Sequence, residues 1–169
     1  MENVTIEPAA VRDRFEKNVP GLGLGRDPAR TPMCWTGGPN GGFTTDMPWL
    51  PVGDNVKRPV NHQAQDASSM LSLYRRLIAL RRAEPALSVG SSESLSLDPE
   101  CLAYGRSYGN ERLVVLLNFS DVMRDVVIPE GSGPACILLS SAADRASHVV
   151  DGTLSLAAAE AVILSLDRK

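Results

Sequence analysis

The stretch that most constrains this chain is residues 25–52, GRDPARTPMCWTGGPNGGFTTDMPWLPV, where Pro, Gly and Trp are crowded together. Loops of this length are normally either functional or disordered. Disorder fits poorly, because a solvated linker would lack large apolar side chains. This stretch carries five of them: Trp35, Phe43, Met47, Trp49 and Leu50. We therefore expect an ordered, irregular loop that packs on another part of the protein.

The composition of the chain changes at about residue 86. Eight of the twelve prolines and eight of the fourteen glycines precede residue 60, so regular structure there must be short. One or two helical turns are expected over residues 8–17, because Pro8 suits an early helical position and apolar residues recur at helical spacing. A longer helix is predicted to begin at a cap by Asp66 and to end before Pro85. Its apolar stripe comprises Met70, Leu73, Tyr74, Leu77, Ile78 and Leu80.

After Pro85 the pattern predicts β-structure throughout. Short apolar runs are separated by Gly, Pro, Asn, Asp and Ser clusters, at the spacing of an antiparallel β-sandwich. The expected strands are residues 101–106, 112–119, 126–128, 135–139, 153–156 and 161–166. Residues 108–111, YGNE, have the composition of a hairpin turn. Residues 157–161, which are rich in alanine, are expected to be a turn rather than a helix.

The overall composition excludes several classes of protein. A net charge of −3 gives no basic footprint for nucleic acid. No apolar run approaches the roughly 20 residues that cross a bilayer, and the first residues lack the pattern of a signal peptide. Three cysteines, Cys34, Cys101 and Cys136, form neither an even set nor a CxxC pair, which argues against a disulfide framework and a zinc site. We expect a cytoplasmic protein without metal or cofactor, and without nucleic-acid or membrane partners.

Three blocks of the sequence carry a family resemblance. The first is a Gly-Arg-Asp-x-x-Arg-Thr-Pro-Met-x-Trp motif, the second a Pro-Asn-x-Gly-Phe-Thr element followed by Pro-Trp-x-x-Val, and the third residues 73–81, LYRRLIALR. The matching residues of the first two are Gly25, Arg26, Asp27, Arg30, Thr31, Pro32, Met33, Trp35, Pro39, Asn40, Gly42, Phe43, Thr44, Pro48, Trp49 and Val52. Together they resemble the α-glucosidase and oligo-1,6-glucosidase branch of glycoside hydrolase family 13, the α-amylase superfamily.

The resemblance implies a division of the chain into two parts. Residues 1–85 would be the end of a (β/α)8 barrel, with residues 1–4 at the exit of the eighth strand, followed by a loop and the last barrel helix. Residues 86–169 would be the C-terminal Greek-key antiparallel β domain. In this family the nucleophilic Asp, the general-acid Glu and a third Asp lie on strands upstream of the matched region. The resemblance thus implies that this chain contains no catalytic residue of the family.

The residues themselves offer little support for separate catalytic chemistry. A retaining glycosidase needs two carboxylates about 5–5.5 Å apart. The irregular region has seven candidates, whose spacing favours no pair: Glu2, Glu7, Asp13, Glu16, Asp27, Asp46 and Asp54. His62 and His148 lie far apart in sequence, and no Ser or Cys stands in a nucleophile-elbow motif.

Arg26 is the candidate substrate-binding residue. In the resembling enzymes this loop walls the mouth of the active site, so Arg26 could donate hydrogen bonds to sugar hydroxyl groups. The alternative is a structural ion-pair cluster with Asp27 and Arg30. Trp35 and Trp49 could stack on sugar rings, but such residues more often pin a loop to a core, and Arg30 could lie over either ring. Asp27, Arg30, Pro32, Trp35 and Trp49 are therefore interpreted as a structural motif.

The sequence departs from the family pattern near this motif. Cys34 stands where the family usually has Gln, and Thr36 where an Asp often follows the Trp. These differences affect the local geometry of the loop rather than the family assignment.

Three functional interpretations remain open. The favoured one is a noncatalytic C-terminal part of an α-glucosidase-type enzyme, which stabilises the barrel and walls the active-site mouth. The runner-up is a carbohydrate-binding β-sandwich module, which Tyr104, Tyr108 and Phe119 support only thinly. An autonomous hydrolase, the third, is disfavoured because the spacing of the carboxylates favours no catalytic pair. The partner would be the rest of the barrel or a second copy bound through an exposed helix and loop, and the ligand an α-glucoside or oligosaccharide. The favoured interpretation predicts an exposed apolar patch on that helix and loop.

Overall fold

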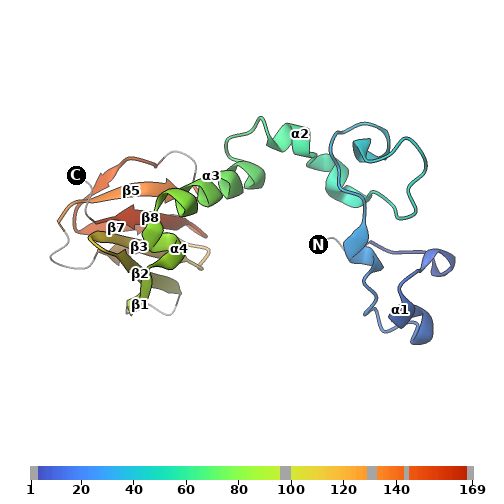
Figure 1. The fold of residues 1–169 in the computed structure, drawn as a ribbon, viewed down its shortest axis with the longest axis horizontal. Coiled ribbons are helices and arrows are strands. Elements are labelled where there is room, and N and C mark those ends of the chain that lie inside the picture. Colours follow the sequence, from blue (N-terminus) through green and yellow to red (C-terminus); the bar gives the residue numbers. More distant parts are fainter. Residues whose placement is uncertain (1–3, 96–99, 129–132, 143–144, 167–169) are drawn as a thin grey trace. The chain divides into compact units, whose positions relative to one another are not determined.

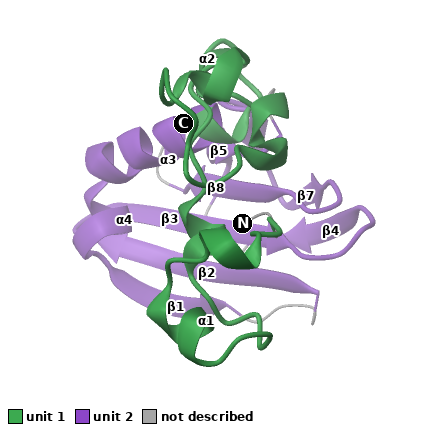
Figure 2. Ribbon diagram, turned by 90° about the vertical axis from the view of Figure 1, so that its right-hand side faces the viewer, with its two compact units in different colours: residues 1–71 green, residues 72–169 purple. Residues whose placement is uncertain are grey.

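The computed structural model describes residues 4–95, 100–128, 133–142 and 145–166. The chain divides into two compact units, residues 1–71 and 72–169 (Figure 2). Unit 1 has two short α-helices, α1 (Arg14–Asn18) and α2 (Val60–Gln63), and 3-10 turns at Pro8–Ala10, Asp27–Arg30, Pro39–Gly42 and Gly53–Lys57. Unit 2 contains nearly all of α3 (Met70–Ala83), together with α4 (Pro85–Val89) and the β-strands.

The helix expected over residues 8–17 is interrupted. The 3-10 turn ends at Ala10, and Val11 and Asp13 have extended backbone angles before α1 begins. Asp13 causes the restart, because its side chain accepts hydrogen bonds from the N–H groups of Phe15 and Glu16 and so caps α1.

The long helix differs from prediction at its start. It begins at Met70 rather than next to Asp66, whose carboxylate instead accepts hydrogen bonds from the N–H and hydroxyl groups of Ser68 in a local turn. The helix does end before Pro85, but the expectation of β-structure directly after it is wrong. Pro85 occupies the first turn of α4, where a missing N–H removes no helical hydrogen bond.

Unit 2 is built of antiparallel strands in two sheets (Figure 1). The strands are β1 (Ser91–Leu95), β2 (Cys101–Tyr108), β3 (Glu111–Asn118), β4 (Arg124–Val127), β5 (Ala135–Ser140), β6 (Val149–Val150), β7 (Thr153–Leu156) and β8 (Ala161–Ser165). The larger sheet has the order β1-β2-β3-β8-β5-β6, and β4 pairs with β7 in the smaller one. The six predicted strands are all present, with ends shifted by up to two residues.

Two strands were missed by the sequence pattern. β1 is polar and almost wholly exposed, and β6 has only two residues, so neither carries an apolar alternation. The hairpin at residues 108–111 is confirmed, with Gly109 in the left-handed region at φ +57°. The alanine-rich segment is also a turn, in which Ala159 has φ +53°.

The core of unit 2 lies between the two sheets. Alternate residues of β3 illustrate this: Val114 and Leu116 point into the core with Val126 of β4 and Leu156 of β7. The full cluster is Cys101, Ala103, Val114, Leu116, Val126, Ile128, Ala135, Ile137, Leu154, Leu156, Val162 and Leu164. Leu113 and Val115, on the opposite face of β3, are buried as well. Side chains from both faces are therefore removed from water, which explains the continuous apolar run in this strand.

Helix α4 is tied to β2 and β3 by two hydrogen bonds. The N–H of Ala86 donates to Glu111 Oε2 at 2.8 Å, and Arg106 Nε donates to the carbonyl of Ala86 at 2.9 Å. The boundary between the two units falls between residues 71 and 72, so nearly all of α3 is grouped with the strands of unit 2. The predicted division into the end of a barrel, residues 1–85, and a β domain, residues 86–169, is a different boundary and stays a prediction. Residues 1–3, expected at the exit of a barrel strand, lie outside the described part of the chain.

The loop in unit 1 is irregular and closely bonded to itself. The N–H groups of Trp35 and Thr36 both donate to the carbonyl of Gly41, at 2.7 and 3.0 Å. Gly41 has φ +63°, and a Cβ there would lie 3.0 Å from the sulfur of Cys34. Cys34 and Leu50 are buried, but Trp35, Phe43, Met47 and Trp49 are exposed. Of the five large apolar side chains expected to pack, only that of Leu50 is removed from water.

Candidate functional site

The candidate site forms around the Gly-Arg-Asp motif, which faces the start of α1. Asp13 and Asp27 have side chains exposed by only 1% and 2%, although both are charged. Asp27 Oδ2 accepts hydrogen bonds from the backbone N–H groups of Arg12 (2.7 Å) and Asp13 (2.8 Å). Its other oxygen pairs with Arg30 at 3.1 Å. Asp27 thereby joins two segments that are 14 residues apart in sequence.

Asp13 completes this cluster. Its Oδ2 accepts a hydrogen bond from Arg26 Nε at 2.9 Å and lies 3.9 Å from Arg30 Nη1. Because its Oδ1 caps α1, both oxygens of Asp13 are occupied. Of the predicted ion pairing, the Asp27–Arg30 pair is present, whereas Arg26 pairs with Asp13, which also lies near Arg30.

The electrostatics of the two carboxylates follow from these contacts. The hydrogen bond from Arg26 lowers the pKa of Asp13 below its ordinary value of 3.8, and the amides of Glu16 and Phe15 add to the effect against the cost of burial. Burial raises the pKa of Asp27, but the N–H groups of Asp13 and Arg12 and the guanidinium of Arg30 more than offset it, so its pKa is lowered too. Both groups are thus held as carboxylates.

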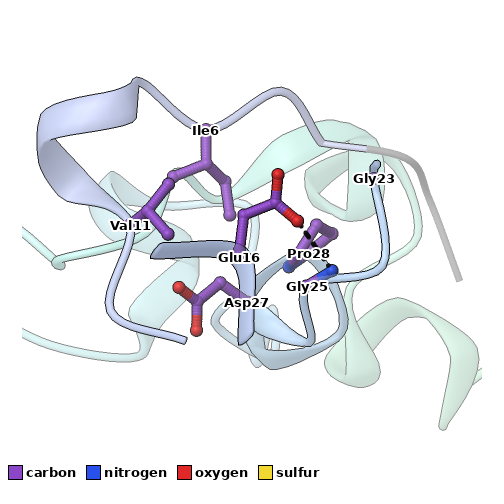
Figure 3. A pocket seen from close by; sticks show the side chains of 7 residues that line it. All are labelled: Ile6, Val11, Glu16, Gly23, Gly25, Asp27 and Pro28. Atoms are coloured by element: carbon purple, nitrogen blue, oxygen red, sulfur yellow. Dashed lines mark hydrogen bonds between the residues drawn. The ribbon is translucent and has the colours of Figure 1, made fainter. Parts of the chain in front are cut away.

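Glu16 holds the other side of the motif. Its carboxylate accepts hydrogen bonds from the N–H groups of Gly25 (3.0 Å) and Gly21 (3.2 Å). A Cβ on Gly25 would lie 2.9 Å from Cβ of Glu16, so only glycine fits there without a shift. Figure 3 shows this contact among the residues that line a small pocket. The volume of the pocket is about 120 Å³. The pocket is lined by Ile6, Val11, Glu16, Gly23, Gly25, Asp27 and Pro28.

Arg26 itself projects toward solvent. Its side chain is 73% exposed, whereas that of Asp13, to which its Nε donates, is 1% exposed. A guanidinium has five N–H donors in a planar fork, and the bond to Asp13 uses one of them. The remaining donors are the kind of group that binds hydroxyl or carboxylate oxygens.

The two tryptophans have different environments. Trp49 Nε1 donates to the carbonyl of Ala10 at 2.7 Å, and the guanidinium of Arg12 lies 4.4 Å from the centre of its ring. The prediction placed Arg30 over a tryptophan; it is Arg12 that lies over Trp49, while Arg30 is drawn to Asp27. Trp49 therefore pins the loop to the segment before α1, as its structural interpretation requires.

Pro32 and Trp35 lie beyond this cluster. Thr31, Pro32, Met33 and Cys34 line a second hollow of unit 1 together with residues of α2. Trp35 is 49% exposed, and its backbone carbonyl accepts a hydrogen bond from the N–H of Asn61. Its ring keeps an accessible surface.

Other chemistry is not assembled in the described part of the chain. No group of three or more His, Cys, Asp or Glu residues there could hold a metal ion. The three cysteines are free, and none of the described helices is long and apolar enough to span a bilayer.

Sequence reasoning missed the roles of Asp13 and Glu16. A usable signal was present, since Asp followed three residues later by Glu is the spacing of a helix N-terminus with a reciprocal cap. The signal did not show that both side chains also bond to residues 21–27, because that depends on how the chain folds back.

Comparison with known proteins assigns the part of the chain that contains this cluster to a family. The profile of the alpha amylase catalytic domain matches residues 1–90. A probable alpha-glucosidase of Rhizobium meliloti (strain 1021) is 44% identical over 98 residues, which are 57% of this chain and 18% of that protein. An oligo-1,6-glucosidase of Parageobacillus thermoglucosidasius is 42% identical over 100 residues, again 57% and 18%.

Solved structures give a consistent result. The trehalulose synthase MutB of Pseudomonas mesoacidophila MX-45 superposes with a TM-score of 0.76 at 33% identity, over 89% of this chain and 28% of that one. Isomaltulose synthase of Klebsiella sp. LX3 gives 0.74 at 29% identity, over 83% and 26%. The chain belongs to the α-amylase family, glycoside hydrolase family 13, and it spans about a fifth of the length of the curated relatives it matches.

Proposed function

We propose that this chain is the noncatalytic C-terminal part of an α-glucosidase-type enzyme, with residues 1–85 completing a (β/α)8 barrel and residues 86–169 forming a Greek-key β domain. Its role is to stabilise the barrel and to wall the mouth of the active site, where Arg26 contacts the glucoside. The whole enzyme hydrolyses or transfers α-glucosyl groups. The similarity to α-glucosidases, an oligo-1,6-glucosidase and two sucrose-isomerase-type synthases supports this assignment of class.

The observation that carries the proposal is the surface of α3. None of its fourteen residues is buried. Met70, Tyr74 and Ile78, which share one side at i, i+4 and i+8, are 62%, 58% and 49% exposed. Tyr74 and Ile78 line a groove that they share with Tyr104 and Val115 of the sheet, and they remain about half exposed there. A soluble helix normally buries its apolar stripe, so a stripe this open fits a helix that packs against further polypeptide. This is the exposed helix surface that the favoured interpretation predicts.

The state of the carboxylates supports a noncatalytic role. A general acid in a glycosidase needs a raised pKa, so the lowered pKa values of Asp13 and Asp27 argue against that one role. A nucleophile is ionised in any case, and against that role stands the burial of both side chains, which are 1% and 2% exposed. Both are also fully engaged by backbone amides and arginines, which leaves no oxygen for a sugar. They act as structural anchors.

The carbohydrate-module alternative receives less support. Tyr108 and Phe119 are exposed, but they stand at opposite ends of the β2–β3 hairpin. Phe119 follows Glu111, the cross-strand partner of Tyr108, by eight residues, which separates the two aromatic residues by roughly 26 Å, too far for one stacking platform. Tyr104 instead lines a groove next to α3.

Complementation tests the proposal. The Rhizobium α-glucosidase, truncated before the segment that this chain matches, would be mixed with the purified chain and assayed on p-nitrophenyl α-glucoside. We expect activity only in the mixture. Tyr74→Asp should abolish complementation, because it places a charge on the apolar stripe, while Ala79→Asp, on the opposite side of α3, should not.

The outcome against the proposal is equally clear. If the chain alone, free of full-length enzyme by mass spectrometry, released p-nitrophenol and a carboxylate substitution within it stopped the reaction, the chain would carry its own catalytic pair. Equal loss from both α3 variants would show that the stripe is not the docking face.

A further inference from the structure

We infer that Asp13 is a positioning residue for Arg26: by bonding to Nε it fixes the guanidinium so that its terminal nitrogens face outward to bind a glucoside. This inference rests on the proposed sugar contact of Arg26. In this inference, the direction in which the Arg26 guanidinium points is set by Asp13, a residue outside the Gly-Arg-Asp motif that lies 13 positions earlier in the sequence.

The two carboxylate oxygens of Asp13 bind different partners. Oδ1 accepts hydrogen bonds from Phe15 N at 3.0 Å and Glu16 N at 3.4 Å, which fixes the carboxylate plane against the helix. Oδ2 is then directed at Arg26 Nε, 2.9 Å away. The helix cap thus determines where the second oxygen lies, and that oxygen determines where the guanidinium lies.

The position of Asp13 is itself fixed by hydrogen bonds. Its own backbone N–H donates to Asp27, which immediately follows Arg26. On the other side of Arg26, the N–H of Gly25 donates to Glu16. Arg26 is therefore held through both neighbours and through its side chain, all by residues 13, 16 and 27. This closed set of bonds leaves the backbone and Nε little freedom.

The bond to Asp13 also lowers the entropy that the guanidinium of Arg26 would lose on binding a ligand. A free arginine side chain loses rotamer entropy when a ligand immobilises it. The charge-assisted bond to the buried carboxylate of Asp13 already restricts the side chain in the folded protein. Less rotamer entropy is therefore lost when a ligand binds. Lysine could not serve both purposes, because it has one nitrogen where arginine has a fork of three.

The test uses the full chain labelled with 15N, in which the Nε–H signal of Arg26 is followed by NMR. Asp13→Asn is the informative variant, since Asn caps helices as well as Asp but cannot offer a second anionic oxygen. We expect solvent exchange of Arg26 Nε–H to rise at least about tenfold. The melting temperature of unit 1 should also fall, because the variant removes the carboxylate of a buried ion pair. Asp54→Asn, which breaks an exposed pair with Lys57, is the matched control.

A second readout is titration with methyl α-glucoside, followed by the shifts of the arginine signals. The response of the wild-type chain should be lost in Arg26→Ala and weakened in Asp13→Asn. Arg26→Lys, an exposed substitution that keeps the charge and the fold, should also lose it. Retention of the response in Arg26→Lys would overturn the positioning role, as would unchanged Nε–H exchange in Asp13→Asn.

The two proposals fail differently. If Arg26→Ala binds the glucoside as the wild type does, the sugar contact in the proposed function is wrong. If Arg26→Ala abolishes binding but Asp13→Asn leaves both exchange and binding unchanged, only the positioning by Asp13 is wrong.

Discussion

At the scale of single residues, two buried carboxylates organise unit 1. Asp27 accepts two backbone N–H groups and one arginine, so removing it leaves three donors without their partner. We expect Asp27→Ala to lower the free energy of unfolding of unit 1 by about 3 kcal/mol. Both tryptophans of the chain, Trp35 and Trp49, lie in this unit, so urea unfolding followed by tryptophan fluorescence measures it. The exposed substitution Asp54→Asn should change the value by less than about 0.5 kcal/mol.

The same carboxylates predict how stability depends on pH. The pKa values of Asp13 and Asp27 are lower in the folded protein than the ordinary value of 3.8. Their contribution to stability is therefore complete above pH 3.8 and is lost as the pH falls through the lower folded values. Tryptophan fluorescence in urea at several pH values should show unit 1 weakening below about pH 4. The double variant Asp13→Asn, Asp27→Asn should flatten this dependence; an equally steep loss would assign it to other groups.

At the scale of elements, the turn at residues 36–42 requires glycine at positions 41 and 42, where the backbone is in the left-handed region. Gly42 has φ +66°, and a Cβ there would lie 2.5 Å from Oγ1 of Thr36. We expect Gly42→Ala to destabilise unit 1 by more than about 2 kcal/mol, from backbone strain and overlap together. Gly23→Ala, with φ +65° but no atom within 4 Å, isolates the strain and should cost about 1 kcal/mol. Equal losses in fluorescence-monitored unfolding would mean that the overlap is relieved cheaply.

At the scale of the whole molecule, the two units should respond separately to a core substitution. Leu164 of β8 is fully buried in the core of unit 2, so Leu164→Ala should cost that unit about 3 kcal/mol through lost burial and a cavity. Circular dichroism of the β-structure should show the shift in urea, while tryptophan fluorescence should not. A matching shift in fluorescence would show that the units unfold as one. We also expect unit 1, with its few buried apolar residues, to unfold at lower urea.

Local patterns in the sequence were sufficient for most of the elements. Proline and glycine content marked the irregular region, and apolar runs with turn residues between them located six of the strands. β1 and β6 were not found because their side chains are not sorted by burial. The long helix was found from its period, but its start was displaced because the carboxylate of Asp66 bonds within a turn of its own.

The sequence by itself determined the family, the irregular loop, the β-rich second half and the candidate Arg26, since each depends on residue types at short spacing. Only the tertiary structure decided that Asp13 is the partner of Arg26, that Arg12 rather than Arg30 lies over Trp49, and which sheet each strand joins. The physical reason is that hydrogen bonds and ion pairs form between side chains that are close in space. Sequence spacing specifies such contacts only within a turn or a helix, whereas the contacts of Asp13 and Asp27 join segments 13 to 15 residues apart.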